Sequence, residues 1–96
     1  MEIPANAQIS SDTVRVLASW TPGTFRVDDD GVAFVPHHGE AIVASFDRLA
    51  RARVTTHLLG ADDIVLELRD GGAWSLKVSD GGGALDELRR RGVTIG

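Results

Sequence analysis

The residue types that could carry out chemistry are few in this sequence of 96 residues, and their spacing does not fit a catalytic site. The chain has no cysteine, which excludes a thiol nucleophile, a thiolate zinc site and an iron–sulfur cluster. Its serines lie in no Gly-x-Ser-x-Gly sequence, the pattern that exposes a catalytic serine at a sharp turn. Asp62 and Asp63 are adjacent, so they do not form a spaced pair of catalytic carboxylates. We therefore expect no catalytic residue, no cofactor and no enzyme activity.

Acidic and histidine residues suggest metal sites, but their geometry argues against each one. In Asp28-Asp29-Asp30-Gly31, an EF-hand register would place Arg26 at the first ligand position and His37 at the twelfth. We expect an acidic hairpin tip there instead. His37 and His38 are neighbours, so on a strand their side chains point to opposite faces unless a turn folds them together. The sequence therefore predicts exposed loop histidines and no metal site.

A polar stripe along one predicted strand is the candidate partner-binding face. Its members are Arg51, Arg53, Thr55 and His57. Such a stripe could hold an acidic protein surface or a nucleic-acid backbone. An ordinary solvent-exposed sheet face, with cross-strand pairs to Glu67 or Asp47, is the preferred interpretation. No aromatic residue interleaves the arginines as a base-stacking platform requires, which argues against a nucleic-acid partner.

The net charge is acidic and belongs to the first half of the chain. Fourteen acidic and ten basic residues give a formal charge of −4 at pH 7, and residues 1–48 carry all of it. Three of the acidic residues are consecutive, at Asp28–Asp30. A dedicated binder of nucleic acid or of an anionic membrane would carry a basic surplus. We therefore expect neither of these partners.

Targeting signals are not recognisable in the sequence. No stretch approaches the ~18–20 consecutive apolar residues of a membrane-spanning helix. Residues 1–6 contain neither the basic region nor the apolar segment of a secretory signal. We therefore expect a cytoplasmic protein.

Turn residues recur every eight to twelve positions and separate short apolar runs, a pattern typical of an antiparallel β meander. Within these runs apolar and polar residues alternate, as in strands with one buried face. The predicted strands are residues 14–20, 25–27, 32–35, 41–46, 52–58, 64–69 and 74–78. Trp20 and Trp74 fall on apolar strand faces, where we expect core packing. For the first run, a helix over residues 12–19 capped by Ser10 or Ser11 is the alternative.

The spacing of apolar residues becomes helical after Gly81–Gly83. Leu85 and Leu88 then share one helical face, and acidic residues precede three arginines, an order that complements the helix dipole. The sequence predicts a helix over residues 83–91, ended by Gly92. So short a helix is marginal alone, so its leucine face must dock on the rest of the domain.

The chain has the features of one small domain. No linker, internal repeat or low-complexity tract divides it. A length of 96 residues with 43% hydrophobic residues suits one core. We predict a single domain over residues 1–96, with its core over residues 12–93 and an N-terminal extension over residues 1–11.

The order of seven strands and one C-terminal helix resembles the pleckstrin-homology (PH)-like barrel. Residues 23–36 (GTFRVDDDGVAFVP) resemble the second and third strands of bacterial PH-like and GRAM-like domains, and residues 42–49 (IVASFDRL) resemble the strand and bend that follow. Residues 72–78 (GAWSLKV) and 85–92 (LDELRRRG) resemble the last strand and the capping helix. The resemblance implies a mainly β fold, a PH-like split barrel of about seven antiparallel strands capped by a C-terminal α-helix. Another small barrel, or a flat meander with a helix on one face, is the alternative.

The same resemblance suggests phosphoinositide binding, which lipid-binding PH domains achieve with Lys and Arg around the first loop. Here the expected loop is Thr21-Pro22-Gly23, and the candidate lipid-binding residues that flank it are Arg15 and Arg26. The loop is too short to cradle a phosphate. Asp28–Asp30 would also repel phosphates, so lipid binding is disfavoured.

We therefore expect a non-catalytic interaction or adaptor module. It would bind a protein through a strand edge or through the face that runs from Arg51 to His57, and strand-edge pairing could also make it a homo-oligomer. Two alternatives stay open. They are lipid or membrane-surface binding through the first loop, and small-molecule binding in a barrel corner lined by Trp20 or Trp74.

Overall fold

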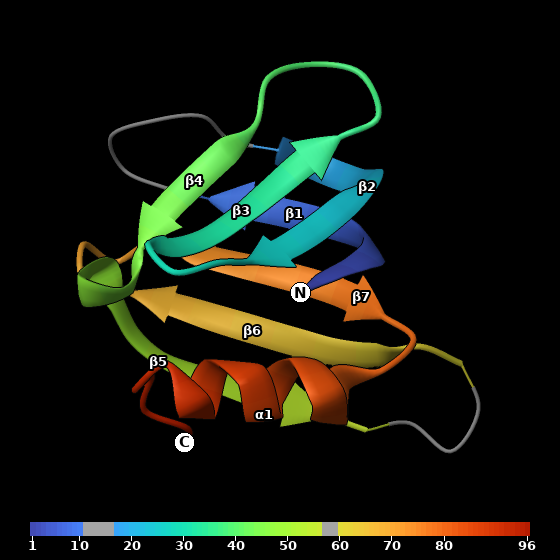
Figure 1. The fold of residues 1–96 in the computed structure, drawn as a ribbon. Coiled ribbons are helices and arrows are strands. Elements are labelled where there is room, and N and C mark those ends of the chain that lie inside the picture. The colour runs from blue at the N-terminus through green and yellow to red at the C-terminus, as the bar shows by residue number, and fades with distance from the viewer. Residues whose placement is uncertain (11–16, 57–59) are drawn as a thin grey trace.

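The computed structural model describes residues 1–10, 17–56 and 60–96, which form one curled seven-stranded sheet and a C-terminal helix (Figure 1). The strands are β1 (Glu2–Ser10), β2 (Leu17–Val27), β3 (Gly31–Pro36), β4 (Ile42–Ser45), β5 (Leu49–Thr55), β6 (Asp62–Leu68) and β7 (Ala73–Val78), and the helix is α1 (Gly81–Arg90). They lie in the order β4-β3-β2-β1-β7-β6-β5, and every neighbouring pair is antiparallel. A short 3-10 turn, Phe46–Arg48, joins β4 to β5.

Alternation along the strands separates a core face from an outer face, which is the sheet face turned away from the core. Buried residues alternate with exposed or half-buried ones along β1, β6 and β7. The largest side chains of the core are Trp74, Phe25, Phe34, Ile9, Ile64, Leu66, Leu76 and Leu88. Burial of these apolar surfaces is the main stabilising contribution to the fold.

Helix α1 closes the open side of the curled sheet beside β5 and β6 (Figure 1). Leu85 and Leu88 are buried on its inner side, as the spacing predicted. The Asp80 side chain caps the first turn by accepting a hydrogen bond from the Gly83 N–H (2.9 Å). At the other end the Val93 N–H donates to the Leu88 C=O (3.1 Å), the long bond of a Schellman motif. Helix α1 is the one helix longer than a single turn among the described residues, and with ten residues it is too short to cross a membrane.

The expectation that residues 1–11 form an extension outside the core is wrong. Glu2–Ser10 form β1, the central strand, which pairs with β2 on one side and β7 on the other. Its buried positions carry the small Ala5 and Ala7 before Ile9, so its apolar signal is weak. Pro4 further hid the strand, since proline is disfavoured in central strands. It is accommodated because pairing with β7 begins only at Ala5.

The division of the next segment into two strands around a loop is also wrong. Leu17–Val27 form one strand, so Thr21-Pro22-Gly23 is not a loop. Gly23 is needed for close approach, because an added Cβ would lie 2.7 Å from the Phe34 ring. In an unbroken strand the inward positions of Phe25 and Val27 place Trp20 on the outer face, where 41% of it is exposed.

The remaining elements lie close to their predicted positions. The alternative helix over residues 12–19 is wrong at its described end, because Leu17–Ser19 belong to β2. Val14 and Val16, which were expected in the first strand, lie outside the described residues. The five predicted strands from residue 32 onward correspond to β3 through β7. The helix begins at Gly81, two residues before its predicted start. Trp74 is buried in the core as expected.

The central position of β1 can be tested by truncating one side chain. Ile9 is 2% exposed, so Ile9→Ala should lower the free energy of unfolding by about 2–4 kcal/mol. Asn6, an exposed residue of the same strand, supplies the control, and Asn6→Ala should change the free energy of unfolding by less than about 0.5 kcal/mol. Urea unfolding followed by tryptophan fluorescence measures both. If Ile9→Ala lowered the free energy of unfolding by no more than Asn6→Ala does, this segment would not be part of the core.

Candidate binding surfaces

The predicted polar stripe lies on the outer face, along the edge strand β5. Arg51, Arg53 and Thr55 are exposed at alternate positions of that strand. His57 lies outside the described residues, so the stripe can be followed only as far as Thr55.

Glu67 on β6 neutralises part of the stripe. The register places Arg51 opposite Glu67, and the Arg51 Nε–H donates to Glu67 Oε2. Arg53 Nη2 lies 3.4 Å from Glu67 Oε1. The hydrogen bond from Arg51, together with the charges of both arginines, lowers the pKa of the Glu67 carboxyl. The same hydrogen bond raises the pKa of the Arg51 guanidinium, so the cluster stays fully ionised at neutral pH and keeps one surplus positive charge.

The two candidate lipid-binding arginines are not brought together around a loop. Arg15 lies outside the described residues, and Arg26 lies within β2. Arg26 Nε is 3.8 Å from Asp28 Oδ2 and has no hydrogen-bond partner among the described residues. The connection between β1 and β2 consists of residues 11–16, not of the predicted loop residues.

The acidic hairpin tip between β2 and β3 uses two of its carboxylates within the fold. Asp28 Oδ1 accepts hydrogen bonds from the N–H groups of Asp30 (2.9 Å) and Gly31 (3.2 Å). The bond from the Asp30 N–H is the main cause that lowers the pKa of Asp28. Asp29 Oδ1 lies 2.6 Å from Arg91 Nη1 at the end of α1. The tip is therefore a structural turn that is tied to the helix.

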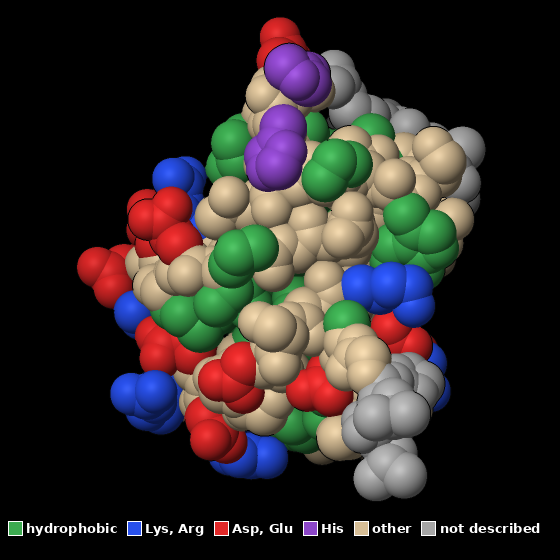
Figure 2. Space-filling view, turned by 90° about the vertical axis from the view of Figure 1, so that its right-hand side faces the viewer, with side chains coloured by type: hydrophobic (Ala, Val, Ile, Leu, Met, Phe, Trp, Pro, Cys, Tyr) green, Lys and Arg blue, Asp and Glu red, His purple; other side chains and the backbone are tan. Residues whose placement is uncertain are grey.

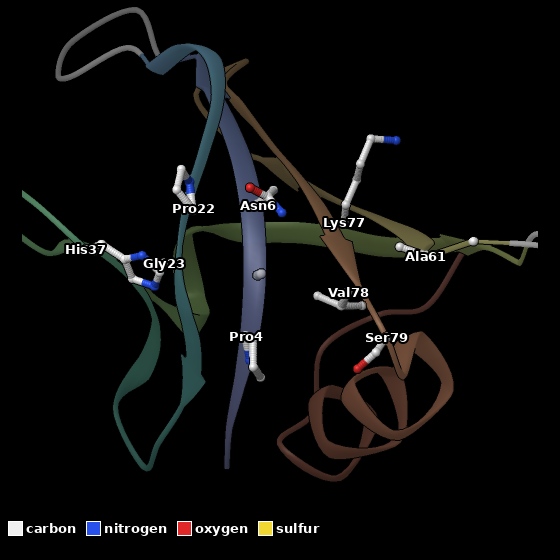
Figure 3. Close-up of a pocket in the computed structure, with 11 residues that line it drawn as sticks. Pro4, Asn6, Pro22, Gly23, His37, Ala61, Lys77, Val78 and Ser79 are labelled. Carbon is white, nitrogen blue, oxygen red and sulfur yellow. The ribbon is translucent and has the colours of Figure 1, made fainter.

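A hollow of about 520 Å³ crosses β2, β1 and β7 (Figure 3). We call it the Asn6 hollow. Its lining residues are Pro4, Ala5, Asn6, Pro22, Gly23, His37, Gly60, Ala61, Lys77, Val78 and Ser79. Asn6 and Pro4 lie on the central strand, with Pro22 on one side and Lys77 on the other (Figure 3). The walls are mostly apolar, and four side chains supply polar groups.

The ammonium group of Lys77 is held beside the hollow by two partners. Lys77 Nζ lies 3.1 Å from Asp63 Oδ1 and 4.8 Å from the centre of the Trp20 ring. Trp20 therefore stacks under a cation on the outer face, whereas Trp74 is buried in the core. Neither tryptophan lines the Asn6 hollow, so this hollow is not the tryptophan-lined corner expected to hold a small molecule.

The Asn6 hollow and the polar stripe belong to one continuous face. Thr55 pairs with Asp63, Asp63 with Lys77, Lys77 with Asn6, and Asn6 with Pro22, in one row across five strands. Figure 2 shows a hollowed face whose centre is hydrophobic or uncharged, with acidic and basic side chains around its margins. Sequence reasoning missed Asn6 and Lys77. The period-two alternation within Glu2–Ser10 was the one signal that could have placed Asn6 on this face.

The pairing at Glu67 predicts how stability depends on pH. The pKa of Glu67 is lower in the folded than in the unfolded chain, so the pairing stabilises the fold above the unfolded-state pKa and is lost as pH falls. The stability difference between the protein and Glu67→Gln should therefore be largest near neutral pH and shrink below about pH 5. Urea unfolding at several pH values measures it, and NMR titration of Glu67 in Arg51→Ala should show its pKa rising toward the ordinary value. A pKa unchanged by Arg51→Ala would refute the pairing.

The comparisons with known proteins identify the fold. No family model and no curated protein matches the sequence. Among solved structures, the PH domain of USP37 matches with a TM-score of 0.78 and 13% identity, over 94% of this chain and 94% of that one. So low an identity carries the fold and not the function. The chain therefore has a PH-like fold, in which seven antiparallel strands curl into a half-barrel that is closed by one C-terminal helix.

Proposed function

We propose that this chain is a non-catalytic protein-binding module whose outer face receives a segment of its partner in the Asn6 hollow. The observation that carries the proposal is the hollow itself, about 520 Å³ with apolar walls and a few polar groups. The half-exposed Trp20 beside it is the residue type most enriched at the energetic centres of protein interfaces. The polar stripe of β5 would form part of the rim of such an interface.

A small molecule is the second candidate for the Asn6 hollow. Its volume lies within the range of about 300–1,000 Å³ typical of ligand pockets. The polar groups available are the amide of Asn6, the imidazole of His37, the ammonium of Lys77 and the hydroxyl of Ser79. Lys77 is already paired with Asp63, so the hollow offers no concentrated charge for an anionic ligand. A protein segment, which contributes neutral amides and apolar side chains, fits this composition better.

We also propose that the chain is a bacterial PH-like or GRAM-like domain. The support is the resemblance of residues 23–36 and 42–49 to the corresponding segments of those domains. These segments form the end of β2, all of β3 and β4, and the turn that follows.

A blocking substitution tests the Asn6 hollow as the binding site. Ala61 and Ala41 are both exposed, but only Ala61 lines the hollow. Peptides selected from a displayed library on the wild-type chain should shift the NMR signals of Asn6 and Lys77. They should bind Ala61→Arg at least about ten-fold more weakly, and Ala41→Arg within about two-fold of wild type. Selected peptides that leave the Asn6 signal unmoved would refute the site, and small molecules that bind there when peptides do not would favour the second candidate.

Membrane binding is expected to be absent. The cation available on the described part of β2, Arg26, faces Asp28, and the adjoining hairpin is acidic. The chain should therefore not co-sediment with vesicles that contain anionic phospholipids, even at low salt. Asp30→Lys, which reverses one repulsive charge, should increase any residual adsorption. Wild-type binding that disappears in Arg26→Ala would contradict this prediction.

A further inference from the structure

The two edges of the sheet differ in whether they are covered. At the β5 edge the Ala52 N–H donates to the Thr94 C=O (2.8 Å), and the Gly96 N–H donates to the Ala52 C=O (3.0 Å). The segment after α1 thus pairs with β5 through a parallel bridge at Ile95. At the other edge, no described residue pairs with β4 on the side away from β3. An uncovered edge strand presents backbone groups that can pair with another chain.

The register identifies the backbone groups that point outward from β4. The Phe46 N–H donates to the Asp30 C=O (3.4 Å), which makes these two residues a hydrogen-bonded pair at the end of the ladder. Because hydrogen-bonded and non-bonded pairs alternate in an antiparallel ladder, Ala44 also bonds to β3. The N–H and C=O groups of Val43 and Ser45 therefore point away from β3. The Val43 side chain is 64% exposed, which makes it the most exposed large hydrophobic side chain described.

A second hollow, of about 310 Å³, lies directly beside this edge. We call it the β4 hollow. Its lining residues are Asp28, Asp30, Gly31, Val32, Ala33, Val43, Ala44 and Ser45. Gly31 contributes no side chain, and none could be added, because a Cβ there would collide with the Ala44 carbonyl oxygen. Apart from the two aspartates and the hydroxyl of Ser45, the lining is therefore apolar side chains and backbone.

The charge around the β4 hollow is negative and only partly compensated. Asp28 faces Arg26 at 3.8 Å, and Asp29 is paired with Arg91. The carboxylate of Asp30 has no ion pair or hydrogen bond among the described residues. A further carboxylate, that of Asp47, accepts a hydrogen bond from Ser45 Oγ (2.5 Å) at the end of β4.

We propose that the β4 edge binds an extended, basic segment of a partner protein by strand addition. The N–H and C=O groups of Val43 and Ser45 would form the ladder with the added strand. Alternate side chains of that strand lie on the outer face, beside the β4 hollow. A Lys or Arg side chain in this position would lay its aliphatic stem over Ala33 and Val43 and bring its cationic head to Asp30. Charge complementarity thus selects a basic partner segment rather than a second copy of this chain, whose β4 is uncharged.

The probe for this proposal is a synthetic peptide in which lysine and threonine alternate, compared with one in which glutamate replaces lysine. The lysine peptide should bind and shift the NMR signals of Val43 and Ser45, and the glutamate peptide should not. Val43→Pro removes one outward N–H, which an edge strand tolerates, and should abolish binding while the thermal midpoint stays near that of wild type. Asp30→Asn should weaken binding at least about five-fold at low salt. Asp86→Asn on α1 changes the net charge equally and should leave the affinity within about two-fold.

Each contrary outcome overturns the proposal. Equal weakening by Asp30→Asn and Asp86→Asn would show diffuse attraction to an acidic protein. NMR signals that shift at Asn6 and not at Val43 would show that the peptide binds at the Asn6 hollow and not at the β4 edge. Self-association through β4 without peptide, seen as a concentration-dependent mass in light scattering, would make a second copy the occupant. The site is independent of the Asn6 hollow, so Ala61→Arg should bind the lysine peptide as wild type does, and either site can fail without the other.

Discussion

The pairing of β1 with β2 and β7 at the same time is the interaction on which the rest of the structure depends. It joins the strands β2 to β4 and the strands β5 to β7 into one sheet, and no other described strand pairing connects these two groups. Two of the inward positions of β1 carry alanine, and one of these residues, Ala5, lies between Gly23 and Val78. Such small residues let neighbouring strands curl toward each other over a compact core. The strand also supplies the floor of the Asn6 hollow, so the same pairing positions the candidate binding face.

Local pairing of charges decides what kind of surface this framework presents. Glu67 forms ion pairs with both arginines of the polar stripe, and Asp29 in the hairpin forms an ion pair with Arg91 at the end of the helix. Exposed pairs of this kind contribute little to stability, but they reduce the positive charge that a polyanionic ligand would need. What is left for recognition is a largely uncharged hollow on one side of the molecule and an acidic sheet edge on another. This distribution is the reason why we propose a protein partner rather than phospholipid head groups.

Much of the fold could be predicted from the sequence, because turn residues bound β3 and β4, β5 through β7 show clear alternation, and α1 shows helical spacing. The prediction failed at the N-terminal end for identifiable physical reasons. Ala5 and Ala7 bury little apolar surface, and Pro4, Pro22 and Gly23 resemble turn residues although each lies within a strand. The predicted number of seven strands agrees with the structure only because two errors cancel, since β1 was missed and β2 was divided into two strands. The division of β2 is also the reason why Trp20, which is exposed on the outer face, was expected in the core.

The sequence by itself determined the approximate positions of β3 through β7 and of α1, and which side of β5, β6 and β7 faces the core. These features are local, because alternation and capping depend on backbone geometry over a few neighbouring residues. Only the tertiary structure decided that β1 is central, that Glu67 binds Arg51 and Arg53, and that the β5 edge is covered while β4 is not. Each of these depends on contacts between residues far apart in the chain, and such contacts are set by how the strands pair and how the sheet curls. The candidate site belongs to this second group, since Asn6, Pro22 and Lys77 meet only when β2, β1 and β7 lie side by side.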